Sequence, residues 1–159
     1  MTPSELCRTT KEAGTQRALF AWANMAQVYG WEAADQDKSY IVKGHAAKLL
    51  ELHNDAEPRL RWLYAVTNQN RGGREAGAID KSMGVKAGVS DVCFPVNSGF
   101  ASSPYYCGLY IELKRETGGS ESKEQKEFGT FVVSQGYKYK CIIGWYLASR
   151  LIKEYLIAK

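Results

Sequence analysis

Three ionisable side chains lie where an otherwise apolar sequence predicts strands. Glu112 and Lys114 are two residues apart in the run GLYIELK (108–114), and Asp91 begins a second apolar stretch. Residues two apart in a strand point to the same face of a sheet. A carboxylate and an ammonium group on a buried face are costly unless they serve a purpose. The three residues together therefore predict a divalent-metal site with a lysine beside it, a combination that suits phosphodiester cleavage.

This chemistry assigns a role to each group. Hydrolysis of a phosphodiester needs hydroxide near neutral pH and charge neutralisation at the phosphoryl group, and Mg²⁺ or Mn²⁺ supplies both. These ions prefer oxygen ligands, so we expect Asp91, Glu112 and the peptide carbonyl of Leu113 to bind the metal. Lys114 would orient the attacking water or stabilise negative charge in the transition state.

The same residues allow a simpler interpretation. A Glu-x-Lys pair at the surface of an edge strand is worth only ~0–1 kcal/mol and indicates no function. In that case the protein would be a plain α/β interaction protein, and Glu112→Gln would change little.

Hydrophobic spacing and turn residues predict the elements that position these groups. Asp91 and Glu112 fall in two strands that we expect to pair as an antiparallel hairpin, and Pro95 argues for an early end to the first strand. Without the two short helices predicted over 46–52 and 75–83, the order of helices and strands along the chain favours a mixed sheet flanked by helices. This is an α/β (α+β) fold. We expect helices over 4–29, 46–52, 75–83, 123–135 and 145–157, and strands over 63–66, 91–96, 105–113 and 137–143.

Capping residues and apolar stripes refine the helices. Ser4 is the expected N-cap of the first helix, and Ser120 or Ser122 that of the helix over 123–135. Gly136 is well placed to end that helix. Apolar spacing puts Phe131 on its buried face and Leu147 on the buried face of the last helix.

A basic, glycine-containing loop follows the first predicted strand. In NQNRGGR (68–74), Arg71 and Arg74 lie beside two glycines, so backbone and guanidinium groups could approach phosphates closely. A solvated loop without a ligand explains the same residues equally well.

Length, charge and cysteine spacing limit the classes of protein to which the chain can belong. The 159 residues are most simply one domain, 1–159, and the net charge of +4 is compatible with nucleic acid as partner without demonstrating it. No pair of cysteines has C-x-x-C spacing, so we expect free thiols rather than a zinc site; they are Cys7, Cys93, Cys107 and Cys141. No run approaches the ~20 apolar residues of a membrane span, and the start of the chain does not resemble a signal peptide. A cytoplasmic protein is expected.

Taken in order, the motifs resemble the virus-type replication-repair nuclease (VRR-NUC) family, a branch of the PD-(D/E)xK nuclease superfamily. The similarity runs over nearly the whole chain, and its specificity lies in the order of the pieces. The matching stretches are Glu12 with Gln16, 65–68 with 72–74, 84–91, 110–114, 122–125 and 136–137.

The resemblance implies a restriction-endonuclease-like core, with a mixed central sheet of about four strands flanked by helices. It implies a Mg²⁺- or Mn²⁺-dependent deoxyribonuclease with Asp91, Glu112 and Lys114 as catalytic core. Glu12 would reach the metal directly or through water, and Gln125 would lie near the site. The implied DNA contacts are Asn68, Arg74 and Lys86, to which the glycine loop adds Arg71.

Small members of the family are similar to Holliday-junction resolvases. The resemblance thus implies a homodimer that cuts branched DNA in phage or bacterial replication, recombination or repair, inside the bacterial cytoplasm. Two departures stand out: Ser90 occupies the usual place of a proline, and Asn68 is further from the double glycine than usual. A non-catalytic DNA-binding protein on the same fold is the alternative, although Asp91, Glu112 and Lys114 are all retained.

Overall fold

The computed structural model describes residues 1–9, 12–37, 55–66, 79, 81–99, 104–117 and 119–157, without the side chains of Thr9 and Glu12. Its helices and strands follow the predicted order along the chain. They are α1 (Pro3–Thr9), α2 (Glu12–Ala34), the 3-10 helix η1 (Pro58–Trp62), β1 (Tyr64–Ala65), β2 (Val92–Phe94), β3 (Leu109–Lys114), α5 (Lys123–Ser134), β4 (Lys138–Ile143) and α6 (Trp145–Ile157).

The described strands form one four-stranded sheet in the order β1-β2-β3-β4. β1 with β2 and β2 with β3 pair antiparallel, whereas β3 and β4 pair parallel. A parallel pair needs a crossover connection, and α5 provides it. The mixed sheet and the α/β (α+β) class are therefore as predicted.

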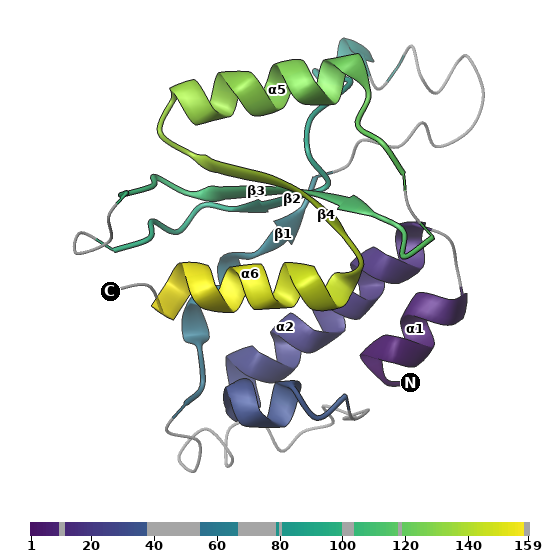
Figure 1. The fold of residues 1–159 in the computed structure, drawn as a ribbon, viewed down its shortest axis with the longest axis vertical. Coiled ribbons are helices and arrows are strands. Elements are labelled where there is room, and N and C mark those ends of the chain that lie inside the picture. Colours follow the sequence, from purple (N-terminus) through teal and green to yellow (C-terminus); the bar gives the residue numbers. More distant parts are fainter. Residues whose placement is uncertain are drawn as a thin grey trace.

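The sheet separates two helical layers (Figure 1). α5 lies on one face, and α2 and α6 lie on the other, with α1 beside α2. Alternate strand residues, among them Phe94 and Ile111, point toward α2 and α6 and form the main core. The strand residues between them point toward α5. This second face therefore lies outside the main core and can carry polar side chains.

The first predicted helix, 4–29, is instead two helices. α1 begins at Pro3, not after an N-cap at Ser4: Thr2 and Glu5 cap it reciprocally, since the Glu5 N–H donates to Thr2 Oγ1 at 3.1 Å and the Thr2 N–H to Glu5 Oε2 at 2.8 Å. α2 continues past the predicted end to Ala34 through a kink at Gly30, whose φ of 86° lies outside the helical region.

The strands are shorter than predicted. β2 ends at Phe94, directly before Pro95, which has no N–H to donate to a neighbouring strand. β3 begins at Leu109 instead of 105. At Gly108, a Cβ would lie only 3.0 Å from the carbonyl oxygen of Phe94.

α5 begins and ends as predicted at Ser122 and Gly136. The Ser122 side chain accepts a hydrogen bond from the Gln125 N–H, and the Gln125 side chain accepts one from the Ser122 N–H, a complete capping box. Gly136 has a φ of 83°, as a C-terminal glycine requires. Phe131 and Leu147, predicted to be buried, are both more than half exposed.

Some predicted elements fall on residues outside the description. The helix over 46–52 and the loop over 68–74 belong to them. Of the helix over 75–83, the structure describes position 79 and residues from 81 onward, which are helical until the turn at Met83 and Gly84. Among the described residues, no helix combines the length and hydropathy needed to cross a membrane.

Candidate metal and catalytic site

Glu112 and Lys114 share the face of β3 that α5 covers. Their side chains are buried, with relative exposures of 2% for Glu112 and 7% for Lys114. Lys114 Nζ donates a hydrogen bond to Glu112 Oε1 at 2.9 Å. The pair is thus an internal ion pair under a helix, and the interpretation as an exposed surface pair is wrong.

Gln125 joins this pair from the first turn of α5. Its Oε1 accepts hydrogen bonds from Lys114 Nζ at 3.1 Å and from the Ser122 backbone N–H at 2.8 Å. Its Nε2 donates to Glu112 Oε1. Because the same amide closes the capping box, the start of α5 fixes where Gln125 meets the two charged groups.

Asp91 reaches the site from the residue before β2. Its Oδ2 accepts a hydrogen bond from the Leu113 backbone N–H at 2.9 Å. The N–H and C=O of one strand residue point to the same side of the strand, and the Lys114 carbonyl accepts from the Gly144 N–H beyond the end of β4. The Leu113 carbonyl therefore points to the opposite side, toward Asp91.

Burial and charge shift the pKa values at this site. Burial, with the nearby negative charge of Asp91, raises the pKa of Glu112 from 4.5 to about 7, against the opposing effect of Lys114. Burial would lower the pKa of Lys114, but its hydrogen bond and attraction to Glu112 outweigh this, and the pKa is raised. Lys114 therefore stays protonated near neutral pH.

One oxygen of Glu112 has a position that suits a cation. Oε2 is buried and, within the described residues, has no hydrogen-bond partner, a situation that costs roughly 1–3 kcal/mol or more for a polar atom. Together with Asp91 and the Leu113 carbonyl it makes a set of oxygen donors, which fits Mg²⁺ or Mn²⁺.

Carboxylates alone do not complete such a site. Among the described residues, no group of three or more His, Cys, Asp or Glu side chains could hold a metal. Asp91 and Glu112 supply two carboxylates, so further ligands have to come from the Leu113 carbonyl, water or a side chain outside the description. Glu12, the first residue of α2, has its side chain outside the description.

The predicted DNA contacts are only partly placed. Asn68, Arg71 and Arg74 lie outside the described residues. Lys86 is exposed in the segment that leads to Asp91. Two residues later, Gly88 (φ 82°) lies so close to α5 that a Cβ would be 2.6 Å from the Glu124 carbonyl carbon, which brings the Lys86 segment next to the start of α5.

Tyr139 is a residue that the sequence analysis missed. Its hydroxyl donates to Glu121 Oε1 at 2.5 Å and lies 3.4 Å from the Gln125 carbonyl oxygen. Its ring packs on Gly129 in the middle of α5. The available signal was that glycine, since a glycine inside a helix costs about 1 kcal/mol relative to alanine and often indicates a close approach.

Cys141 is the second missed neighbour. It is the strand partner of Glu112 across the parallel pair of β3 and β4. Burial, followed by the negative charge of Glu121, raises the pKa of its thiol. The pairing of β3 with β4 could not be derived from the spacing of the motifs.

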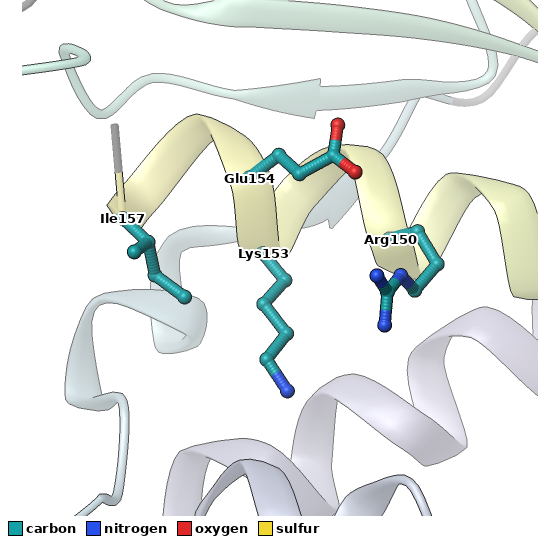
Figure 2. Close-up of a pocket in the computed structure, with 4 residues that line it drawn as sticks. All are labelled: Arg150, Lys153, Glu154 and Ile157. Atoms are coloured by element: carbon teal, nitrogen blue, oxygen red, sulfur yellow. The ribbon is translucent and has the colours of Figure 1, made fainter.

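Two of the hollows that described residues line lie in the helical layer on the opposite face of the sheet. One, of about 420 Å³, runs beside α6, and its described lining is Arg150, Lys153, Glu154 and Ile157 (Figure 2). The other, of about 210 Å³, lies between α1, α2 and α6. None of the predicted site residues is in the described lining of either hollow.

Comparison with known proteins bears on the fold. No family model matches the sequence, and no curated protein matches it. A solved structure described as a VRR_NUC domain protein is similar, with a TM-score of 0.60 and 19% identity over 94% of this chain and 91% of that one. The chain therefore has the fold of a VRR_NUC domain protein, as the order of its motifs predicted.

Proposed function

We propose that the protein is a Mg²⁺- or Mn²⁺-dependent deoxyribonuclease that hydrolyses phosphodiester bonds. The observation that carries the proposal is the group formed by the buried Glu112 and Lys114 with the half-buried Gln125, beside Asp91, in which Glu112 Oε2 has no described partner. Burying these charges costs free energy, and a nuclease centre gives that cost a purpose. The similarity of fold to a VRR_NUC domain protein supports the same activity.

Each residue has a proposed role. Asp91, Glu112 and the Leu113 carbonyl would hold the metal, which when bound supplies a hydroxide and neutralises the phosphoryl group. Lys114, protonated and hydrogen-bonded on two sides, would stabilise charge on the phosphoryl oxygens or orient the water. Gln125 would hold Lys114 and Glu112 in place.

The finer parts of the proposal concern DNA. Glu12 would complete the metal site, and Lys86 with Asn68, Arg71 and Arg74 would contact phosphates. We further propose a homodimer acting on branched DNA, as in Holliday-junction resolution during phage or bacterial replication, recombination or repair in the cytoplasm. Symmetric four-way junctions match a dimer whose two sites face the same way.

The test is cleavage of a panel of branched and linear DNAs with Mg²⁺ and Mn²⁺. Asp91→Asn and Lys114→Met should abolish metal-dependent cleavage while thermal unfolding remains cooperative. Lys123→Met is the matched control, because Lys123 is an exposed α5 lysine whose ion pair with Glu127, at 3.8 Å, lies at the surface. Cleavage at the parental rate by either site variant would show that the site is wrongly assigned.

One observation favours the alternative of a DNA-binding protein without catalysis. Glu112 Oε1 already accepts hydrogen bonds from both Lys114 and Gln125, and these donors compete with a cation. Calorimetric titration with Mn²⁺ separates the two functions: heat of binding that is lost in Asp91→Asn supports the nuclease, and no binding at millimolar Mn²⁺ supports the alternative.

A further inference from the structure

The face that carries the proposed site continues as a row of tyrosines. Tyr64 on β1 is paired with Cys93 on β2, and Cys93 with Tyr110 on β3. Tyr110 lies two residues before Glu112, and Cys93 two residues after Asp91. Because side chains two apart share a face, this row lies one step along the strands from the proposed metal ligands.

Contacts confirm that these side chains gather on that face. The side chains of Tyr64 and Tyr110 both interact with the buried Cys93 thiol. The Tyr110 ring packs edge-on against Phe128 of α5 at 5.2 Å between centroids and lies 5.4 Å from the Tyr137 ring. The row is therefore on the α5 side of the sheet, where Glu112 and Lys114 also lie.

The two ends of the row differ in exposure. α5 covers Tyr110 through Phe128, whereas the Tyr64 side of the row is open and Tyr64 is 49% exposed. Its side chain stands on a strand beside the Cys93 thiol, with about half of its surface open to solvent. An aromatic face that is open to solvent can bind nucleobases by stacking, with little dependence on sequence.

Strand geometry sets the distance to the site. Two residues along a strand and one strand across place the Tyr64 Cα about 8 Å from that of Asp91, so both residues can meet neighbouring nucleotides of one DNA strand. A base inside a duplex is stacked on both neighbours and cannot offer a face to a protein side chain unless it leaves the helix. Within continuous duplex the ring therefore has no free base face to stack on, whereas an unpaired nucleotide next to the cleaved phosphate offers one.

We propose that Tyr64 stacks on an unpaired base beside the cleaved phosphate. The substrate class is then DNA with at least one unpaired nucleotide at the cleavage point, as in a flap, a bulge or an open junction, rather than continuous duplex. This inference rests on the proposed nuclease function and adds the substrate feature that the site selects.

The experiment measures binding without cleavage, in EDTA. Two DNAs of the same sequence carry 2-aminopurine either in a short single-stranded extension or within continuous duplex, and quenching of its fluorescence reports stacking. Tyr64→Ala should weaken binding of the extended DNA about tenfold, the usual order for one stacked base, and abolish the quenching. Tyr64→Phe should retain both, and binding to continuous duplex should change less than twofold.

Tyr146→Ala is the matched control, because Tyr146 is 56% exposed on α6, in the layer on the other face of the sheet. It should bind both DNAs like the parent. If Tyr64→Ala binds the extended DNA like the parent, or loses affinity equally for both DNAs, the stacking role is excluded while the nuclease proposal stands. If the parent binds neither DNA and cleaves none, both proposals fail.

Discussion

The Tyr139 ring occupies the space that a side chain at position 129 would need: a Cβ on Gly129 would lie 2.6 Å from Tyr139 Cε1. The same tyrosine donates to Glu121 just before α5. Two points of contact therefore set the position of α5 over β4, and with it the position of Gln125 over Glu112 and Lys114.

Gly129→Ala should destabilise the protein, although alanine favours helix by about 1 kcal/mol over glycine. Overpacking costs typically 1–3 kcal/mol, and here the added methyl group meets a ring that is held by its hydroxyl. The measurement is the midpoint of urea unfolding. In a Tyr139→Ala background the same substitution should become neutral or stabilising, and a double-mutant cycle without coupling would contradict the contact.

Gln125→Ala should lower the rate constant for cleavage at least tenfold with little change in KM. The substitution removes the amide oxygen that accepts from Lys114 and the amide N–H that donates to Glu112. In the proposed mechanism Glu112 holds the metal and Lys114 acts on the reacting phosphate. Steady-state kinetics on a cleaved substrate provide the measurement.

Its control is Ser122→Ala. This substitution removes the other half of the capping box and should cost about 1 kcal/mol of stability, but it leaves the Gln125 side chain intact. Equal losses of activity in the two variants would mean that Gln125 matters only for the helix.

Without metal, the protein should become less stable as pH rises from about 5 to above 7. Glu112 has a folded-state pKa of about 7, against 4.5 as its ordinary value, so the folded state holds a proton that the unfolded state has lost in this window. Thermal midpoints in EDTA across this pH range measure the effect. Glu112→Gln has no such carboxyl group and should lack this component of the pH profile.

Mg²⁺ or Mn²⁺ should reverse that loss. A cation that binds only the folded state raises the thermal midpoint, and it needs the deprotonated carboxylate, so the increase should grow between pH 5 and 8. Asp91→Asn should show a much smaller increase. A midpoint that does not respond to millimolar metal in the parent protein would contradict the assignment of ligands.

Ser90→Ala should stabilise the protein by about 1 kcal/mol. Ser90 is completely buried, and in the described part of the chain its hydroxyl has no hydrogen-bond partner, so the substitution removes a desolvated polar atom. Ser149→Ala is the comparison, because that buried hydroxyl donates to the Tyr146 carbonyl at 2.7 Å and its loss should be destabilising. Equal effects of the two substitutions would contradict this interpretation of Ser90.

Local sequence signals predicted those parts of the site that depend on short-range structure. An N-cap at Ser122, one of two candidates, was predicted from its place before the helix, and Glu-x-Lys placed two side chains on one face, because both signals act within a few residues. Burial was harder to predict. Phe131 fits an apolar stripe but is exposed, since α5 packs on the sheet through the narrow strip around Gly129 and Val132. Leu147 is exposed as well, because α6 buries the neighbouring Ala148 and Leu151 instead.

The partners in contacts between distant residues could not be derived from local signals. A glycine at position 129 inside a helix indicates a close approach, but that its neighbour is Tyr139, and that Glu112 pairs with Cys141, depends on how the crossover folds back. The spacing of motifs along the chain does not contain that information.

The crossover has a consequence for the order in which the protein folds. The parallel pair of β3 and β4 is connected through α5, and the entropy of closing that connection has to be overcome before the two strands pair. Until then Glu112 is hydrated, so the free-energy cost of its burial falls on the docking step. Local opening that lifts α5 would expose Glu112 again and dismantle the site without unfolding the core. Exchange of the α5 amide protons with solvent would therefore report the fraction of molecules competent for function.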